Sequence, residues 1–269
     1  MNSEFLDAAR VFLCLAVFVY ASWSDWKKRE VSNKVWLIMA PIAFALTFVQ
    51  FVFYSPNWLQ LFGLSFGITA GLSIALFYVG AFGGADAKAL MCLALALPVY
   101  PHILSQIFQF NASNLQVIFP ITVFSNGVLL AALTVVYSIL RNCIWKLRSG
   151  RGLFEGLESE SVWRKAMAFL TGYKVSAASL EKGHVYPLED IDTKEGGEVE
   201  RRLLIMPKDE KVEGIVERVL SATRDGRLPN MVWVTPGLPL LVFITMGLVV
   251  ALVFGNIVWV LLRFIFLRI

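Results

Sequence analysis

The sequence predicts an α-helical polytopic membrane protein with six transmembrane helices and a small α+β domain inserted before the last helix. Its 269 residues are 57% hydrophobic and only 16% charged, whereas soluble domains have about 45–50% apolar and about 25% charged residues. The mean hydropathy is correspondingly high, at +0.67. Residues 141–233 hold 16 of the 24 Lys and Arg and 15 of the 20 Asp and Glu. Residues 35–140, by contrast, contain only two charged side chains, Asp86 and Lys88.

The same composition excludes several classes of protein. A chain this apolar is neither disordered nor built around a basic nucleic-acid-binding tail. The three cysteines, Cys14, Cys92 and Cys143, show no C-x-x-C spacing, so they indicate neither a disulfide framework nor a zinc site. No metal, no other cofactor and no nucleic-acid partner are therefore expected.

Six stretches of the chain are long and apolar enough to cross a bilayer as a helix, which takes about 20 residues. In chain order they are residues 5–23, 35–54, 58–82, 87–107, 115–140 and 238–267. The last is longer than a span requires, which predicts tilt or an interfacial end. Residues 1–140 are thus expected to form a membrane domain of five helices, and residues 234–269 to contain the sixth. Gly63, Gly67 and Gly71 recur every four residues, which predicts close packing of the third helix.

The polar insert, residues 141–233, separates the fifth predicted helix from the sixth. Residues 158–173 and 209–223 carry apolar side chains at helical spacing. Residues 201–206 and 231–234 are short apolar runs typical of strands. The insert is therefore expected to be a small soluble domain of mixed α and β structure.

Lys and Arg in the short loops predict the orientation of the chain. Four basic residues follow the first helix, Lys88 precedes the fourth, and residues 141–151 contain four more. The alternate loops, residues 55–57 and 108–114, carry no charge. Because cytoplasmic loops are enriched in Lys and Arg, the basic side is expected to be cytoplasmic. This places the insert inside the cell, both termini outside, and the protein in the cell membrane.

Five carboxylates lie outside the insert: Glu4, Asp7, Asp25, Glu30 and Asp86. Glu4 and Asp7 are expected to be a solvated flank at the outer end of the first helix. Asp25 directly follows the first predicted helix, and Asp86 directly precedes the fourth. Carboxylates at the membrane border are costly, which favours a functional role for this pair.

Asp25 and Asp86 are expected at the same, cytoplasmic end of the helices, because the chain crosses the membrane twice between them. If they also face each other, the pair could share one proton, since two ionised carboxylates a few Å apart repel. The ionised Asp would then take a proton from water while the protonated Asp polarises a peptide carbonyl.

A structural interpretation stays open for the same residues. Asp86 could simply cap the fourth helix, where a negative charge meets the positive end of the helix dipole, and Asp25 could neutralise Lys27. Gly83 and Gly84 would permit close approach of an extended substrate peptide, or could form an ordinary tight turn.

The motif Gly83-Gly84-Ala85-Asp86 resembles the G-x-G-D motif of intramembrane-type aspartyl proteases, although Ala85 stands where the motif has its second glycine. The region around Asp25 is similar to the first aspartate region of the type IV prepilin peptidase family. In both, the aspartate is followed by basic residues and then by a short element, here Val31-Ser32-Asn33. The plan of six helices with a polar insert is most similar to the archaeal preflagellin peptidases. The cysteine-rich zinc region of many bacterial members is absent, and the insert carries no motif of the family.

The resemblance implies a membrane aspartyl endopeptidase with Asp25 and Asp86 as its catalytic pair and Gly83, Gly84 and Ala85 as the turn that a substrate approaches. Its partners would be the lipid bilayer and preflagellin (archaellin) or prepilin-like precursors, whose short basic leader it would remove at the cytoplasmic face. Acidic side chains are candidates for holding that leader, namely Glu30, Glu155, Glu158 and Glu160.

Two other classes of function are alternatives. A proton- or cation-coupled transporter could use Asp86, but it would usually place the acid near the membrane midplane and contain repeated halves. A non-catalytic membrane assembly protein would be indifferent to both aspartates. The position of both carboxylates at one border, together with the motif, favours the peptidase.

Overall fold

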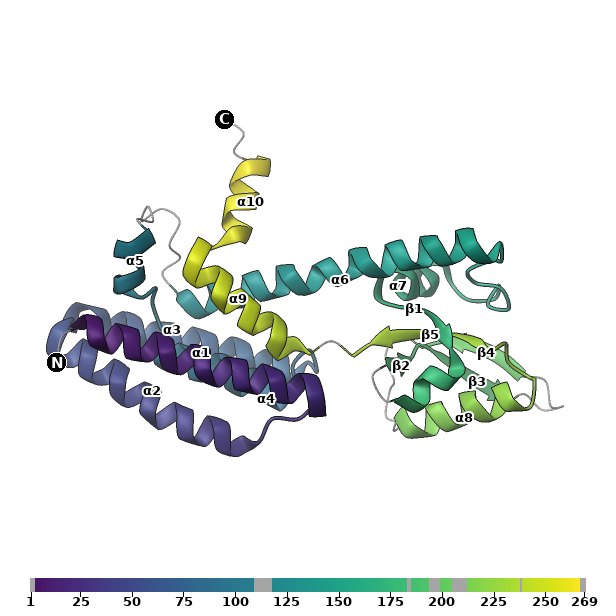
Figure 1. The fold of residues 1–269 in the computed structure, drawn as a ribbon, viewed down its shortest axis with the longest axis horizontal. Helices are drawn as coiled ribbons and strands as arrows, with labels where there is room; N and C mark the ends of the chain where they lie inside the picture. Colours follow the sequence, from purple (N-terminus) through teal and green to yellow (C-terminus); the bar gives the residue numbers. More distant parts are fainter. Residues whose placement is uncertain are drawn as a thin grey trace. The chain divides into compact units, whose positions relative to one another are not determined.

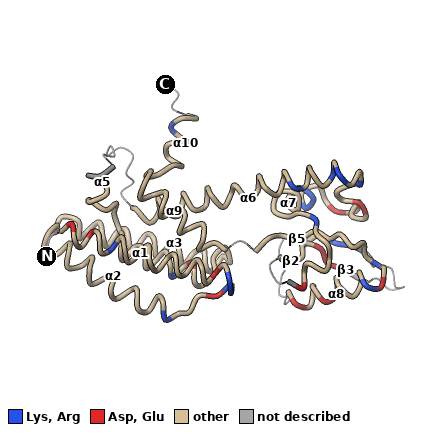
Figure 2. Tube along the Cα trace, viewed as in Figure 1, with Lys and Arg blue, Asp and Glu red and all other residues tan. Residues whose placement is uncertain are grey.

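The computed structural model describes residues 3–108, 118–182, 185–193, 199–204, 212–237 and 239–266. The chain forms two compact units (Figure 1): Met1–Ala131 with Pro239–Ile269, and Ala132–Leu238. Charged residues are sparse along the helices of the first unit and frequent in the second (Figure 2). The charge distribution of the sequence therefore corresponds to a division of the fold.

The first unit is entirely helical in its described residues. Its elements are α1 (Ser3–Lys28), α2 (Asn33–Tyr54), the 3-10 turn η1 (Pro56–Trp58), α3 (Leu59–Tyr78), α4 (Gly84–Ala96), α5 (His102–Phe108), the first part of α6 (Phe119–Ser149), α9 (Leu240–Phe254) and α10 (Ile257–Phe266). By length and composition, α1, α2, η1 with α3, and α6 can each cross a membrane, and α9 with α10 makes a fifth span if that bent pair is counted as one. The chain is thus a multi-pass membrane protein, and the number of six spans stays a prediction.

The fourth predicted helix, residues 87–107, is instead two short helices, α4 and α5, separated by residues 97–101. Pro98 and Pro101 lie in this break, and proline disfavours helical backbone in the residue before it and supplies no N–H of its own. The carbonyl of Pro98 accepts a hydrogen bond from Ser65 Oγ at 2.7 Å. Neither α4 nor α5 is long enough to span a membrane alone.

The last predicted helix, residues 238–267, is also broken, and α9 meets α10 at 68°. Gly255 ends α9 with a φ of 70°, a left-handed conformation that glycine adopts without strain. Asn126 of α6 satisfies the freed backbone groups: its Nδ2 donates to the Gly255 carbonyl at 2.8 Å and its Oδ1 accepts from the Ile257 N–H at 3.1 Å. Residues 238 and 267 lie outside the described part of the chain.

Close helix packing involves other glycines than those predicted. A Cβ added at Gly63, Gly67 or Gly71 would meet nothing within 4 Å, so the expectation of close packing at these positions is wrong within the described chain. A Cβ at Gly247 of α9 would instead lie 2.5 Å from the Val123 carbonyl and 2.6 Å from the Gly127 nitrogen. The backbones of α6 and α9 therefore touch at Gly127 and Gly247.

Helix α4 is at the centre of the first unit and packs against α1, α2, α3 and α9. It has only 13 residues, and seven of them are buried. Its small side chains, among them Ala87, Ala89 and Ala96, allow the neighbouring helices to approach it closely. The start of α4 is therefore held in a fixed place relative to α1.

The second unit contains two small antiparallel sheets. The strands β1 (Tyr173–Ser176), β5 (Met231–Pro236) and β2 (Val185–Pro187) form one sheet in that order, and β3 (Glu189–Thr193) pairs with β4 (Val199–Leu203) in the other. The helices are α7 (Val162–Thr171) and α8 (Val212–Arg224), together with the 3-10 segment η3 (Ala177–Lys182) and the last part of α6. Trp233 in the middle of β5 is fully buried.

The expected α+β content of the insert is confirmed, with different bounds. The helix predicted over residues 158–173 is shorter, because Ser161 caps α7 and Tyr173 already belongs to β1. The helix predicted over residues 209–223 corresponds to α8, and residues 209–211 lie outside the described part. The two predicted strands, residues 201–206 and 231–234, correspond to β4 and β5, and residues 205–206 likewise lie outside the described part.

Candidate active site

Asp25 and Asp86 line one cavity of about 650 Å³ in the first unit. Its walls are the end of α1, the loop from α1 to α2, and residues 83–86 at the start of α4. Asp25 lies within α1 rather than after it, because that helix continues to Lys28. The cavity thus brings together all five residues that the sequence singled out: Asp25, Gly83, Gly84, Ala85 and Asp86.

The loop between α1 and α2 is a tight connection with specific contacts. Arg29 has a φ of 56°, an uncommon left-handed conformation for a residue other than glycine, and its N–H donates to the Asp25 carbonyl at 2.9 Å. Ser24 Oγ donates to the Glu30 carbonyl at 2.8 Å. Lys88 Nζ of α4 donates to Asn33 Oδ1 at 2.7 Å, a contact that the sequence did not predict. The last contact joins the start of α2 to the start of α4.

Asp86 does cap α4, as the structural interpretation expected. Its Oδ2 accepts a hydrogen bond from the Gly83 N–H at 3.0 Å. Within the described residues, no hydrogen bond reaches its other oxygen, Oδ1. A Cβ at Gly83 would lie 3.1 Å from Asp86 Oδ2, whereas one at Gly84 would make only an ordinary contact of 3.8 Å with Phe77. The cap therefore orients the carboxylate and leaves it on the wall of the cavity.

Asp86 lies in the first turn of α4, outside the helices that are long enough to span a membrane. Burial raises the pKa of the Asp86 carboxyl to about 6; the Gly83 N–H works against this rise, and the negative charge of Asp25 adds to it. A carboxyl group that titrates near neutral pH can hold a proton and release it during a reaction.

Asp25, near the end of α1, lies beside the start of α9. The backbone of Leu241, in the first turn of α9, interacts with its carboxylate. Ser22, one turn earlier in α1, fixes this approach: its Oγ donates to the Leu241 carbonyl at 3.0 Å and lies 2.6 Å from Thr245 Oγ1. The sequence alone gave no sign that the start of α9 would reach Asp25.

The expected neutralisation of Asp25 by Lys27 is not seen in the described residues. Lys27 Nζ instead lies 4.4 Å from the centroid of the Trp23 ring, a distance typical of a cation–π contact. No ion pair joins Lys27 to Asp25 there. The neighbouring cation whose charge acts on Asp25 is Arg29 rather than Lys27.

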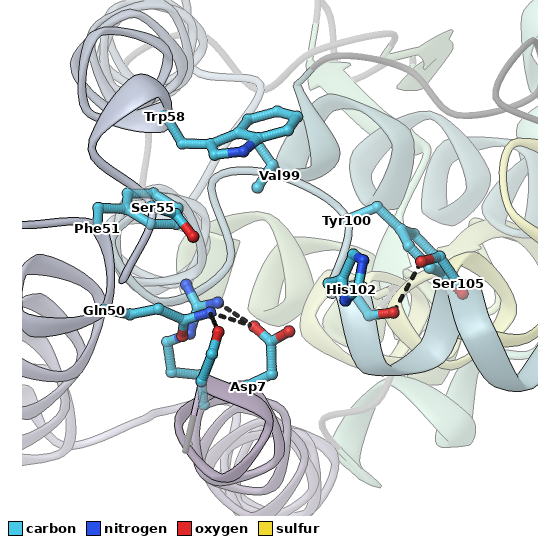
Figure 3. A pocket seen from close by; sticks show the side chains of 11 residues that line it. Asp7, Gln50, Phe51, Ser55, Trp58, Val99, Tyr100, His102 and Ser105 are labelled. Atoms are coloured by element: carbon cyan, nitrogen blue, oxygen red, sulfur yellow. Dashed lines mark hydrogen bonds and ion pairs between the residues drawn. The ribbon is translucent and has the colours of Figure 1, made fainter. Parts of the chain in front are cut away.

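The expectation that Asp7 is a solvated flank is wrong. Asp7 and Arg10 are 2% and 1% exposed and form an ion pair. Asp7 also accepts from Gln50 Nε2 at 3.0 Å and from the Ile103 N–H at 3.3 Å, and Arg10 donates to the Ala96 carbonyl at 3.2 Å. Asp7, Arg10 and Gln50 line a cavity of about 410 Å³, in which Asp7 and Gln50 point toward each other (Figure 3).

The sequence contained a signal for this buried cluster. Asp7 and Arg10 are spaced i, i+3, so they lie on the same face of a helix. The apolar second helix also carries two polar residues, Thr47 and Gln50, with that same spacing. The matching spacing could have predicted that the polar side chains of the first two helices face each other and are buried, instead of being exposed to solvent.

The structure contains no cluster suited to a metal ion in its described ranges, where no three His, Cys, Asp or Glu side chains come together.

Both units match proteins of known families. Residues 12–141 match the type IV leader peptidase family, and residues 164–257 match the model described as archaeal peptidase A24 C-terminus, type II. A preflagellin peptidase of Methanococcus voltae is 27% identical over 239 residues, which cover 88% of this chain and 91% of that relative. Asp25 and Asp86 both fall within the first match. The chain is therefore a membrane protease that is similar to the type IV leader peptidases over most of its length.

Proposed function

We propose that the chain is an aspartyl endopeptidase that cleaves the basic leader peptide from preflagellin or prepilin-like precursors, with Asp25 and Asp86 as its catalytic pair. The observation that carries this proposal is the single cavity that both carboxylates line together with the Gly83–Ala85 turn. The similarity to a preflagellin peptidase supports the choice of substrate.

The two carboxylates divide the chemistry of peptide hydrolysis between them. Asp86, whose pKa of about 6 lets it hold a proton, donates that proton to the carbonyl oxygen of the scissile peptide. Asp25 is the ionised partner, which takes a proton from a water molecule as the water attacks the carbonyl carbon. As the tetrahedral intermediate collapses, the leaving amine takes the proton held by Asp25. Asp86 recovers its proton from a hydroxyl group of the intermediate as the new carboxyl group forms.

The turn at residues 83–85 is proposed to receive the substrate backbone. Gly83 and Gly84 have no side chains that would keep an extended peptide away from Asp86. Space around Gly84 is open except for the contact to Phe77 at 3.8 Å. The scissile bond can therefore approach Asp86 along this turn.

Of the four glutamates suggested for leader binding, Glu30 is the one that lines the cavity with both aspartates. Glu160 is already engaged, since it accepts from the Leu203 N–H at 2.7 Å and pairs with Arg164 at 3.2 Å. Lys28 and Arg29 line the same cavity, and they repel a basic leader. We therefore assign a leader cation to the Glu30 side of the cavity.

The cavity is proposed to face the cytoplasm, with both termini outside. Lys27, Lys28 and Arg29 cluster at the end of α1 beside it, and such clusters mark the cytoplasmic ends of membrane helices. A precursor's apolar helix would then lie in the bilayer, with its basic leader at the same face as Asp25 and Asp86.

The test is cleavage of a preflagellin-like precursor by the purified full-length chain in detergent. The wild-type chain is expected to release the leader, and Asp25→Asn and Asp86→Asn are expected not to. Asp225→Asn, at an exposed position paired with Arg227 in the second unit, is the matched control and should cleave normally. Wild-type cleavage by either of the first two variants would contradict the catalytic pair.

A further inference from the structure

The second unit contains a cavity of about 330 Å³ that plays no part in the proposed peptidase chemistry. Three cationic side chains line it, together with Trp145, Asn230 and Glu155. The cations are Lys174 of β1, Arg201 of β4 and Arg151 in the loop after α6. They come from three separate parts of the sequence, so the fold brings them together.

Lys174 is the unusual member of this group. It is 8% exposed, and lysine is almost never so buried without a partner of opposite charge. Its Nζ lies 4.6 Å from the centroid of the Trp145 ring and 5.9 Å from that of Trp233. Those ring faces stabilise a cation, but no hydrogen bond or ion pair to a described residue satisfies its three N–H donors.

Both oxygens of the nearby Glu189 carboxylate already have hydrogen-bond partners. One oxygen, Oε2, pairs with Arg201 at 2.7 Å, and the other, Oε1, accepts from the Trp233 N–H at 2.9 Å. Burial lowers the pKa of Lys174, and the charge of Glu189 only partly opposes this effect. The positive charge of Lys174 is therefore left without a carboxylate bound to it.

Arg201 is built into the wall of the cavity in a fixed position. Besides Glu189, its guanidinium donates to the Glu155 carbonyl at 2.9 Å. Gly156 has a φ of 78°, and a Cβ there would lie 2.7 Å from Arg201 Nη1. A side chain at this turn would be strained and would push the guanidinium away.

The balance of charge in the cavity leaves one cation over. Three cations, Arg151, Lys174 and Arg201, stand against the carboxylates of Glu155 and Glu189, so one positive charge is in excess. From this arrangement we infer that the cavity binds a phosphate group, with Lys174 as its central ligand and Arg151 and Asn230 as further donors. A phosphate offers oxygens in several directions, so it can accept from donors on different walls at once.

Two sources could supply the phosphate, a free ion and a lipid headgroup. The lipid headgroup is included because Trp145 lies in the last turns of α6 and Arg151 follows the end of that helix. Helix α6 is long and apolar enough to cross a membrane. The inference is independent of the peptidase assignment, since none of these residues lines the cavity of Asp25 and Asp86.

Isothermal titration of the full-length chain in a phosphate-free, non-ionic detergent tests the site. Sodium phosphate is titrated in one arm, and mixed micelles containing phosphatidic acid in the other. Saturable binding is expected in at least one arm, and Lys174→Met should weaken it by about 10- to 100-fold, as expected for loss of a hydrogen bond to a charged group. Lys174→Arg should retain most of the affinity. Binding in one arm only identifies the source.

The matched control is Lys165→Gln, which removes a lysine of α7 in the same unit that does not line the cavity. It should change the affinity by less than about twofold, as is usual for surface substitutions. Arg151→Gln, at an exposed position, serves as a second test variant if Lys174→Met does not fold, and it too should weaken binding. No binding in either arm, equal binding of acetate, or unchanged affinity in the variants would overturn the inference.

Discussion

Helix α1 has an aspartate near each end, and the two differ in their burial and in their partners. At one end, Asp7 is sealed from solvent and paired with Arg10. At the other, Asp25 shares an open cavity with Asp86. An aspartate with a fixed cation has its charge satisfied and can only hold the fold together, whereas two carboxylates on one cavity wall can exchange a proton with water and substrate. The partners of each carboxylate thus decide its role.

The sealed end also affects the open one. The Asp7–Arg10 cluster bonds α1 to Thr47 of α2 and to the Ala96 carbonyl at the end of α4. Asp25 and Asp86 lie at the opposite ends of α1 and α4. By joining these two helices at one end, the cluster helps to fix how far one aspartate stands from the other.

The largest effect is expected at the open end. Asp86→Asn and Asp25→Asn should each lower the cleavage rate by about 10²- to 10⁴-fold, the usual contribution of a general acid or base, without a loss of thermal stability. Single-turnover cleavage of a precursor and a thermal melt of the same preparations measure the two quantities. If a variant loses activity only because it unfolds, its aspartate has a structural role like that of Asp7, and the catalytic role is contradicted.

The next effect is expected at the sealed end. Arg10→Met leaves Asp7 buried without its cation, and breaking a buried ion pair in this way costs about 3–5 kcal/mol. Unfolding in detergent should therefore occur at a clearly lower temperature. The double variant Arg10→Met with Asp7→Leu should be more stable than Arg10→Met alone, because no unpaired charge remains. Equal stability of Arg10→Met and the wild type would show that the pair has no structural role.

Cleavage is expected to depend on pH through Asp86. The pKa of its carboxyl is raised from 3.8 to about 6, so the proton that it donates is present below about pH 6 and is lost above it. The value of kcat/KM should then fall about tenfold for each pH unit above the pKa, as for any essential acid. A rate that rises steadily from pH 6 to pH 8 would assign the proton to another group.

The same shift predicts an effect on stability with a definite sign. Between about pH 4 and pH 6 the folded chain holds a proton on Asp86 that the unfolded chain releases, so stability falls as the pH rises through this window. Asp86→Asn cannot ionise and escapes this loss. It should therefore melt at a higher temperature than the wild type at pH 7.5 and at nearly the same temperature at pH 4. A melting temperature below that of the wild type at pH 7.5 would contradict the burial of an ionised Asp86.

Local patterns predicted much of the open end. Asp86 was recognisable because charge is so scarce around it and because two glycines precede it. Asp25 was recognisable from its place at the end of an apolar helix. The contact of Leu241 with Asp25 was not predictable, because it joins residues more than 200 positions apart through the packing of α9. Spacing along one chain contains no information about which helices become neighbours.

The sealed end shows the opposite error. Asp7, together with Glu4, resembled an ordinary charged flank of an apolar helix, since charges at helix ends are usually solvated. The burial of Asp7 and Arg10 depends on Thr47 and Gln50 of α2 and on the chain break after Ala96, where α5 turns back over Asp7. The break in turn follows from Pro98 and Pro101, which a hydropathy window averages away. The same prolines explain why the fourth predicted span is two short helices.

The smallest and most discriminating effect is expected at the glycine turn beside Asp86. Gly84→Ala should leave the melting temperature unchanged, since the new methyl group would make only an ordinary contact with Phe77 at 3.8 Å. It would nevertheless project where the substrate backbone is proposed to lie, so KM should rise a few-fold while kcat changes little. Gly83→Ala places a methyl group 3.1 Å from Asp86 Oδ2 and should instead lower kcat, because it displaces the carboxylate itself. Steady-state values of kcat and KM for the two variants separate a role in substrate approach from a role in positioning the carboxylate. Identical changes of kcat and KM in both variants would show that the turn has only one of these roles.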